Sequence, residues 1–105
     1  MQEKVPAVKA EIVELIRQTV RTSMKPFGLK TVDVRAGEDH DGDPVIFIEA
    51  QYDLSETPLE LGVTGKLASI LWDRLLRAGE TRFPHVRHKF HEKQKVKPAA
   101  RRAGV

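Results

Sequence analysis

The sequence predicts an α+β fold, a two-layer sandwich in which two helices cover one face of a small three-stranded sheet. Amphipathic helical and strand-like stretches follow one another in the order helix, strand, strand, short helix, helix, strand. The clearest strand is residues 44–53, where β-branched and aromatic side chains concentrate. With 105 residues, the chain has room for one domain, expected over residues 1–90, followed by a basic tail over residues 91–105.

The first helix is expected over residues 5–25. Pro6 is tolerated in a first turn, and Pro26 with Gly28 ends the helix. Its apolar residues recur at steps of three and four, which places them on one stripe: Val5, Val8, Ile12, Leu15, Ile16, Val20, Met24 and Phe27.

Two strands are expected to form a hairpin over residues 31–36 and 44–53. The first alternates apolar and polar residues, as a half-buried strand does. In the second, the core is expected on the face of Ile46, Ile48, Ala50 and Tyr52. The flanking helices must therefore pack on that face.

The acidic loop between these strands has two interpretations. Its carboxylates could supply oxygen ligands to a metal ion, from Glu38, Asp39, Asp41 and Asp43. However, Gly42 comes too early for the calcium-loop pattern, and Asp and Gly are the residues that turns prefer. An exposed turn is the favoured interpretation, and no metal is expected.

A second helical region follows the hairpin. Thr57 is expected to cap a short helix or helical turn, with Pro58 in its first turn and Glu60 closing a capping box, and a loop is the alternative for this segment. The glycines of Gly62-Val63-Thr64-Gly65 are expected to break the chain before a helix over residues 66–78.

An edge strand is expected over residues 81–90, because Pro84 is unsuited to a central strand. His85 and His88 would then point to opposite faces, so a zinc site with His91 is not expected. Phe83 or Phe90 could stack on a base or be buried in the core.

Charge and composition limit the functional classes. Residues 79–105 hold eight of the 18 Lys and Arg residues but only Glu80 and Glu92 among the 15 acidic ones. Such a basic end is typical of chains that meet phosphate or an acidic partner, and equally of solubilising tails. The chain has no cysteine and no membrane-length apolar run, so a cytoplasmic location without a membrane partner is expected.

The element order, with Gly62-Val63-Thr64-Gly65 between helical segments, resembles a type II KH domain of the kind found in ribosome-binding factor A. The resemblance implies a non-enzymatic RNA-binding module in which the two glycines let the backbone approach the nucleic acid. The residues expected to contact RNA or another phosphate-rich partner are Gly62, Gly65, Lys66, Arg82, Arg87, Lys89, Lys93, Lys95 and Lys97.

A protein-interaction module is the alternative hypothesis. An antitoxin-like or other regulatory protein could pair its exposed edge strand, residues 82–90, with a partner or with a second copy as a homodimer. No nucleophile elbow, Walker loop or dinucleotide fingerprint is present, so neither enzymatic activity nor a cofactor is expected.

Overall fold

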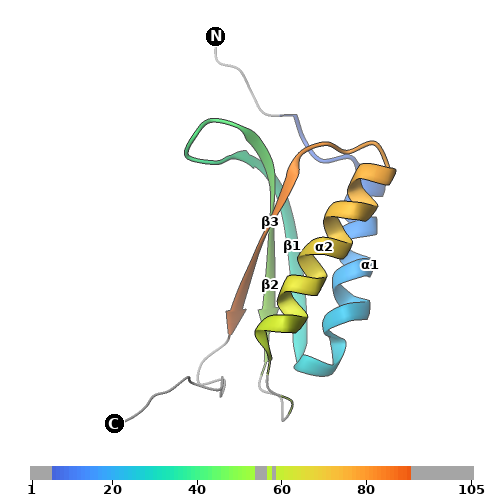
Figure 1. The fold of residues 1–105 in the computed structure, drawn as a ribbon, viewed down its shortest axis with the longest axis vertical. Helices are drawn as coiled ribbons and strands as arrows, with labels where there is room; N and C mark the ends of the chain where they lie inside the picture. The colour runs from blue at the N-terminus through green and yellow to red at the C-terminus, as the bar shows by residue number, and fades with distance from the viewer. Residues whose placement is uncertain (1–5, 54–56, 58, 91–105) are drawn as a thin grey trace.

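The computed structural model describes residues 6–53, 57 and 59–90 of the chain. Helix α1 (Ala10–Met24) and a short 3-10 helix, η1 (Lys25–Phe27), lead into the strands β1 (Leu29–Glu38) and β2 (Pro44–Tyr52). Helix α2 (Leu61–Arg77) then leads to strand β3 (Phe83–Phe90). Both helices lie side by side on one face of the three-stranded sheet (Figure 1). The predicted α+β two-layer architecture is confirmed.

Strand β2 is the centre of the sheet. It pairs with β1 as an antiparallel hairpin and with β3 in parallel. The parallel pairing follows from the crossover through α2, which carries the chain back along the sheet before β3 begins (Figure 1). The expected hairpin and the expected edge position of the last strand are both confirmed.

The core lies between the helices and the face of β2 that the sequence predicted. Ile46, Ile48, Ala50 and Tyr52 are all buried there. They pack with one face of each helix, which contributes Ile12, Ile16, Val20 and Met24 from α1 and Leu67, Leu71 and Leu75 from α2.

Helix α1 begins later than the sequence predicted. Residues 6–9 are not helical, and Lys9 takes the N-cap position in an extended conformation. The carbonyl oxygen of Pro6 accepts a hydrogen bond of 2.7 Å from Arg82 Nη1. This contact ties the segment to the start of β3, while Val8 packs against the core.

The expected glycine break is wrong. Gly62 and Gly65 lie inside α2, which runs without interruption from Leu61 to Arg77. Of the alternatives for the segment before the glycines, the short helix is wrong and the loop is observed at the described residues, since Thr57 and Glu60 are not helical and Glu60 takes the N-cap position without a side-chain capping bond. The buried stripe of Leu67, Leu71 and Leu75 extends back to Val63, which packs against the core. Burial of this stripe outweighs the cost of two helical glycines.

Residues 91–105 lie outside the described part of the chain, and with them the predicted tail and its lysines. Among the described residues, neither helix has the length and apolar character needed to cross a bilayer.

Candidate nucleic-acid interface

One face of the sheet is covered by the two helices, and the other faces away from them. Because side chains alternate along a strand, the residues opposite the core share this second, open face. On β1 these residues are Thr31, Asp33, Arg35 and Gly37. Their partners on β2, in the same order, are Gln51, Glu49, Phe47 and Val45, and the partners of those on β3 are Lys89, Arg87, His85 and Phe83. None of the described helices packs on this open face (Figure 1).

Phe47 occupies the middle of the open face. Its ring lies across Gly37, where an added Cβ would overlap the ring carbon Cε2. The guanidinium carbon of Arg35 lies over the ring, 4.7 Å from its centroid, which is a cation–π arrangement. On the other side, the His85 ring lies 5.7 Å from the Phe47 ring. Arg35, Phe47 and His85 thus form a continuous row across the three strands.

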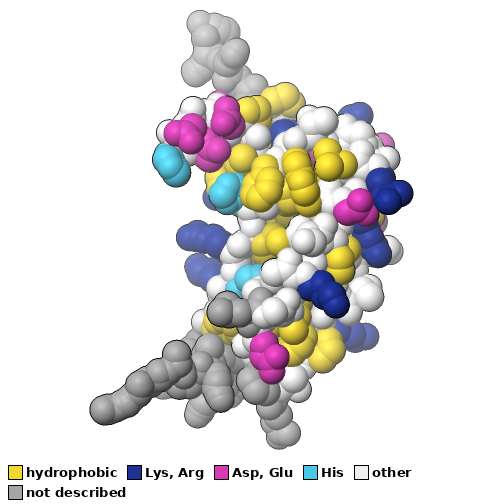
Figure 2. All heavy atoms as spheres, in the orientation of Figure 1, with side chains coloured by type: hydrophobic (Ala, Val, Ile, Leu, Met, Phe, Trp, Pro, Cys, Tyr) yellow, Lys and Arg dark blue, Asp and Glu magenta, His cyan; other side chains and the backbone are white. Residues whose placement is uncertain are grey.

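Positive charge follows directly below this row on β3. Arg87 and Lys89 are both exposed there, and the Lys89 ammonium lies 3.9 Å from Glu49. A hollow of about 560 Å³ runs between the row and Arg87, lined also by Asp33 and Glu49. Lys and Arg side chains project on the side of the molecule away from the helices, and others lie on the helical side (Figure 2). The hollow therefore combines aromatic, cationic and two acidic side chains.

The acidic turn at residues 39–43 stands at one end of the open face. Asp39 Oδ1 accepts backbone hydrogen bonds of 2.9 Å from Asp41 and from Asp43. The bond from Asp43 is the main cause that lowers the pKa of the Asp39 carboxyl. Gly42 adopts a left-handed φ of 86°, as tight turns require. The predicted exposed turn is confirmed. Its hydrogen bonds explain why an Asp stands at residue 39, and its left-handed backbone explains why a Gly stands at residue 42.

Carboxylate oxygens of Asp39, Asp41 and Asp43 lie within 4.8 Å of one another. This spacing would suit a cation, but exposed acidic groups commonly gather in turns. The absence of a metal site stays a prediction.

The two histidines of β3 lie on opposite faces, as the strand pattern predicted. His85 is exposed on the open face, whereas His88 is half-buried on the core face. The Tyr52 hydroxyl and His88 Nδ1 form a hydrogen bond of 2.7 Å, and the Phe90 ring stacks on Tyr52 at 5.0 Å. Burial raises the pKa of Tyr52 and lowers that of His88. Phe90 therefore serves the core rather than the surface.

Phe83 lies at the edge of the sheet and is 48% exposed. Its ring makes an edge contact of 5.3 Å with Trp72 of α2 and one of 5.4 Å with His85. Leu76, one turn after Trp72, is 46% exposed. Trp72, Leu76 and Phe83 thus form an apolar patch. Hydrophobic side chains reach the surface where α2 faces the start of β3 (Figure 2).

Arg82, predicted to contact phosphate, already has partners inside the domain. Its guanidinium donates hydrogen bonds of 2.8 and 3.1 Å to the two carboxylate oxygens of Glu80, and a third to Pro6. Both side chains of the pair are largely buried. The Arg82 hydrogen bond is the main cause that lowers the pKa of Glu80, and the Glu80 hydrogen bond is the main cause that raises the pKa of Arg82. Arg82 thus ties the N-terminal segment to the start of β3.

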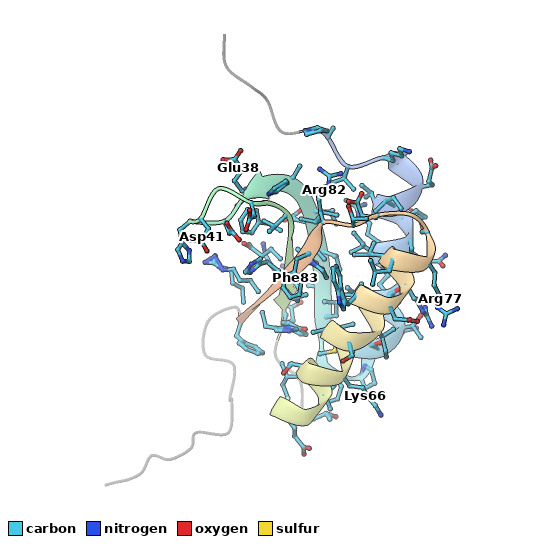
Figure 3. The ribbon with its side chains drawn as sticks, turned by 45° about the horizontal axis from the view of Figure 1, so that its top comes forward. Glu38, Asp41, Lys66, Arg77, Arg82 and Phe83 are labelled. Atoms are coloured by element: carbon cyan, nitrogen blue, oxygen red, sulfur yellow. The ribbon has the colours of Figure 1, made fainter. Side chains whose placement is uncertain are left out.

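The remaining predicted contact residues do not form one surface. Arg87 and Lys89 belong to the open face, whereas Gly62, Gly65 and Lys66 lie on the exposed side of α2. Lys66 projects from α2 away from the sheet (Figure 3). Lys93, Lys95 and Lys97 lie outside the described residues.

Sequence reasoning missed Arg35 and Phe47. The signal was present, because both occupy positions opposite the core face in strands whose alternation was recognised. Only the register of the hairpin, which pairs Arg35 with Phe47, brings the two side chains together.

Comparison with known proteins gives little further information. No family model and no curated protein sequence matches the chain. A solved structure from work on the mode of action of CzrB, described as a candidate zinc transporter, is 20% identical to this chain. It matches with a TM-score of 0.45 over 80% of this chain and 98% of that chain. A similarity at this level identifies neither a family nor a function.

Proposed function

We propose that this protein binds single-stranded RNA on the open face of its sheet and performs no catalysis. The observation that carries the proposal is the row of Arg35, Phe47 and His85 beside the cationic pair Arg87 and Lys89. Sheet-based RNA-binding modules use the same two components, namely aromatic or guanidinium planes that stack on bases and cations that contact phosphates.

The arrangement suits a single strand better than a duplex. Bases in a single strand are free to stack on the row, whereas a duplex offers mainly its phosphates and groove edges. Arg87 and Lys89 lie on one side of the row, and the acidic turn lies at the end of the hairpin. The phosphates are therefore placed toward β3 and away from Asp41 and Asp43.

The basic residues 91–105 follow β3 directly in the sequence and add charge of the same sign. They would raise the affinity without providing stacking. The KH-like mode stays a separate prediction that this proposal does not need, since Gly62 and Gly65 lie in a helix. A cytoplasmic location, where RNA is available, also stays a prediction.

Fluorescence anisotropy with a short labelled single-stranded RNA over a salt series tests the proposal. Each phosphate contact on a single strand contributes about 0.7 to the log–log salt slope. The double substitution Arg87→Ala and Lys89→Ala is expected to lower the slope by about 1.4 and to weaken binding at least tenfold.

Two control proteins distinguish the open face from charge alone. Arg21→Ala with Lys25→Ala removes the same charge from the helical side, and it is expected to change binding little. The second control protein carries alanine at Lys93, Lys95 and Lys97 and tests the contribution of the basic tail. If only the tail variant loses RNA binding, the open face is not the RNA site and the proposal fails.

A further inference from the structure

The exposed side of α2 carries a pattern that neither the core nor the open face explains. Gly62 and Gly65 are exposed, and a Cβ added at either would meet no other group of the described chain within 4 Å beyond its own helix. A glycine inside a helix is less stable than alanine at the same position. Nothing in the described part of the domain needs that cost at two neighbouring positions.

These glycines belong to a regular stripe along the exposed side of α2. Steps of three, four, three and four residues join Gly62, Gly65, Ser69, Trp72 and Leu76, the spacing of a helix-pairing seam. The first half of the stripe is small and the second half is large and apolar. Leu76 is 46% exposed, although a leucine at a seam position normally has a partner.

We propose that a second copy of this chain packs on the stripe, with the two α2 helices antiparallel about a two-fold axis. An antiparallel arrangement brings the large half of one stripe over the small half of the other. Leu76 then lies over Gly65 of the second copy, and Trp72 lies over Ser69 of the second copy. Such an interface is isologous, because each surface is its own complement.

The charges beside the stripe fit the same register. Lys66 and Asp73 flank the stripe on the same side, one heptad apart, and both are exposed. The antiparallel pairing sets Lys66 of each copy opposite Asp73 of the other. Within its own helix Asp73 already accepts a hydrogen bond of 3.0 Å from Arg77 Nε, so its carboxylate would be shared between Arg77 and Lys66 of the second copy. Lys66 and Arg77 project away from the sheet, where a second copy can reach them (Figure 3).

Pairing through the edge of β3 is less complementary. Pro84 lacks a donor, and Arg87 and Lys89 are the kind of side chains with which natural edge strands avoid pairing. The α2 stripe also leaves Arg35 and Phe47 uncovered, so dimerisation and the proposed RNA binding are independent.

Sedimentation equilibrium of the full chain tests the dimer. The native chain is expected to dimerise, and Gly65→Gln and Leu76→Lys are each expected to weaken the dimer at least tenfold. Gln is a better helix former than Gly, so Gly65→Gln keeps the fold, which circular dichroism checks. Thr22→Gln, on the exposed side of α1, is the matched control and is expected to dimerise as the native chain does.

A charge exchange tests the register. Lys66→Asp and Asp73→Lys are each expected to weaken the dimer, and the two together to restore it. A native chain that stays monomeric up to about 1 mM, where any interaction is weaker than about 4 kcal/mol, would overturn the proposal. A dimer that survives both Gly65→Gln and Leu76→Lys would overturn it as well, because another surface would then hold the copies together.

Discussion

Phe47 takes its place on the open face because Gly37 has no side chain. The ring lies in the space that a Cβ at Gly37 would fill, and Arg35 covers it from β1. Aromatic side chains commonly compensate for a strand glycine in this way. The sequence shows the alternation that points Phe47 outward, but it does not show which neighbour the ring lies across.

His88 gives a residue-scale prediction about stability. Burial lowers the pKa of His88, so the unfolded chain binds this proton at a higher pH than the folded chain does. Above the free histidine pKa of about 6.5 the contribution to stability is complete, and as the pH falls below that value it is progressively lost. The loss levels off once His88 also becomes protonated in the folded chain.

Urea unfolding of the native chain and of His88→Gln at pH 7.5 and pH 5 measures this effect. The native chain is expected to lose more stability between the two pH values than the variant, which keeps a polar partner for Tyr52 but cannot titrate. An equal loss in both proteins would show that His88 protonation is not linked to folding.

The contacts of Arg82 could not be predicted from its residue type alone. The basic end of the chain suggested phosphate binding, yet the structure gives Arg82 a buried pair with Glu80 and a bond to Pro6. Pro6 is distant from Arg82 in the sequence, so local patterns could not pair them. Arg87 and Lys89, by contrast, are exposed, as contact with a phosphate requires.

At the scale of elements, the periodicity of apolar residues predicted the helices and strands better than the positions of glycine residues did. The first two strands and the core face of β2 follow from alternation, and they are observed. The prediction that the glycines break the helix was wrong, because local helix propensity is a weak preference that packing overrides. Val63 and Leu67 bury apolar area only if the helix continues through Gly65. The predicted start of α1 was wrong because a tertiary hydrogen bond holds Pro6 outside the helix.

The continuous helix makes an element-scale prediction. Gly62→Ala and Gly65→Ala are each expected to raise the free energy of unfolding by about 0.5–1 kcal/mol, since alanine fits an open helical site without strain. Chemical denaturation at high dilution, where the chain is monomeric, measures the change. A loss of stability in both variants would show that these positions are not helical.

At the scale of the whole molecule, the two surfaces lie on different layers. The open face belongs to the sheet, and the α2 stripe belongs to the helical layer (Figure 1). The sequence predicted basic contact residues from both surfaces as one set, because it could not show that α2 and β3 present them in different directions. Arg87 and Lys89 remain in the proposed RNA site, joined by Arg35 and Phe47, which only the hairpin register brings together.

The most direct measurement is an NMR titration of the ¹⁵N-labelled full chain with a short single-stranded RNA. The account predicts the largest amide shift changes at Arg35, Phe47, His85 and Arg87, with small changes along α2. Shift changes confined to α2 or to residues 91–105 would contradict binding on the open face.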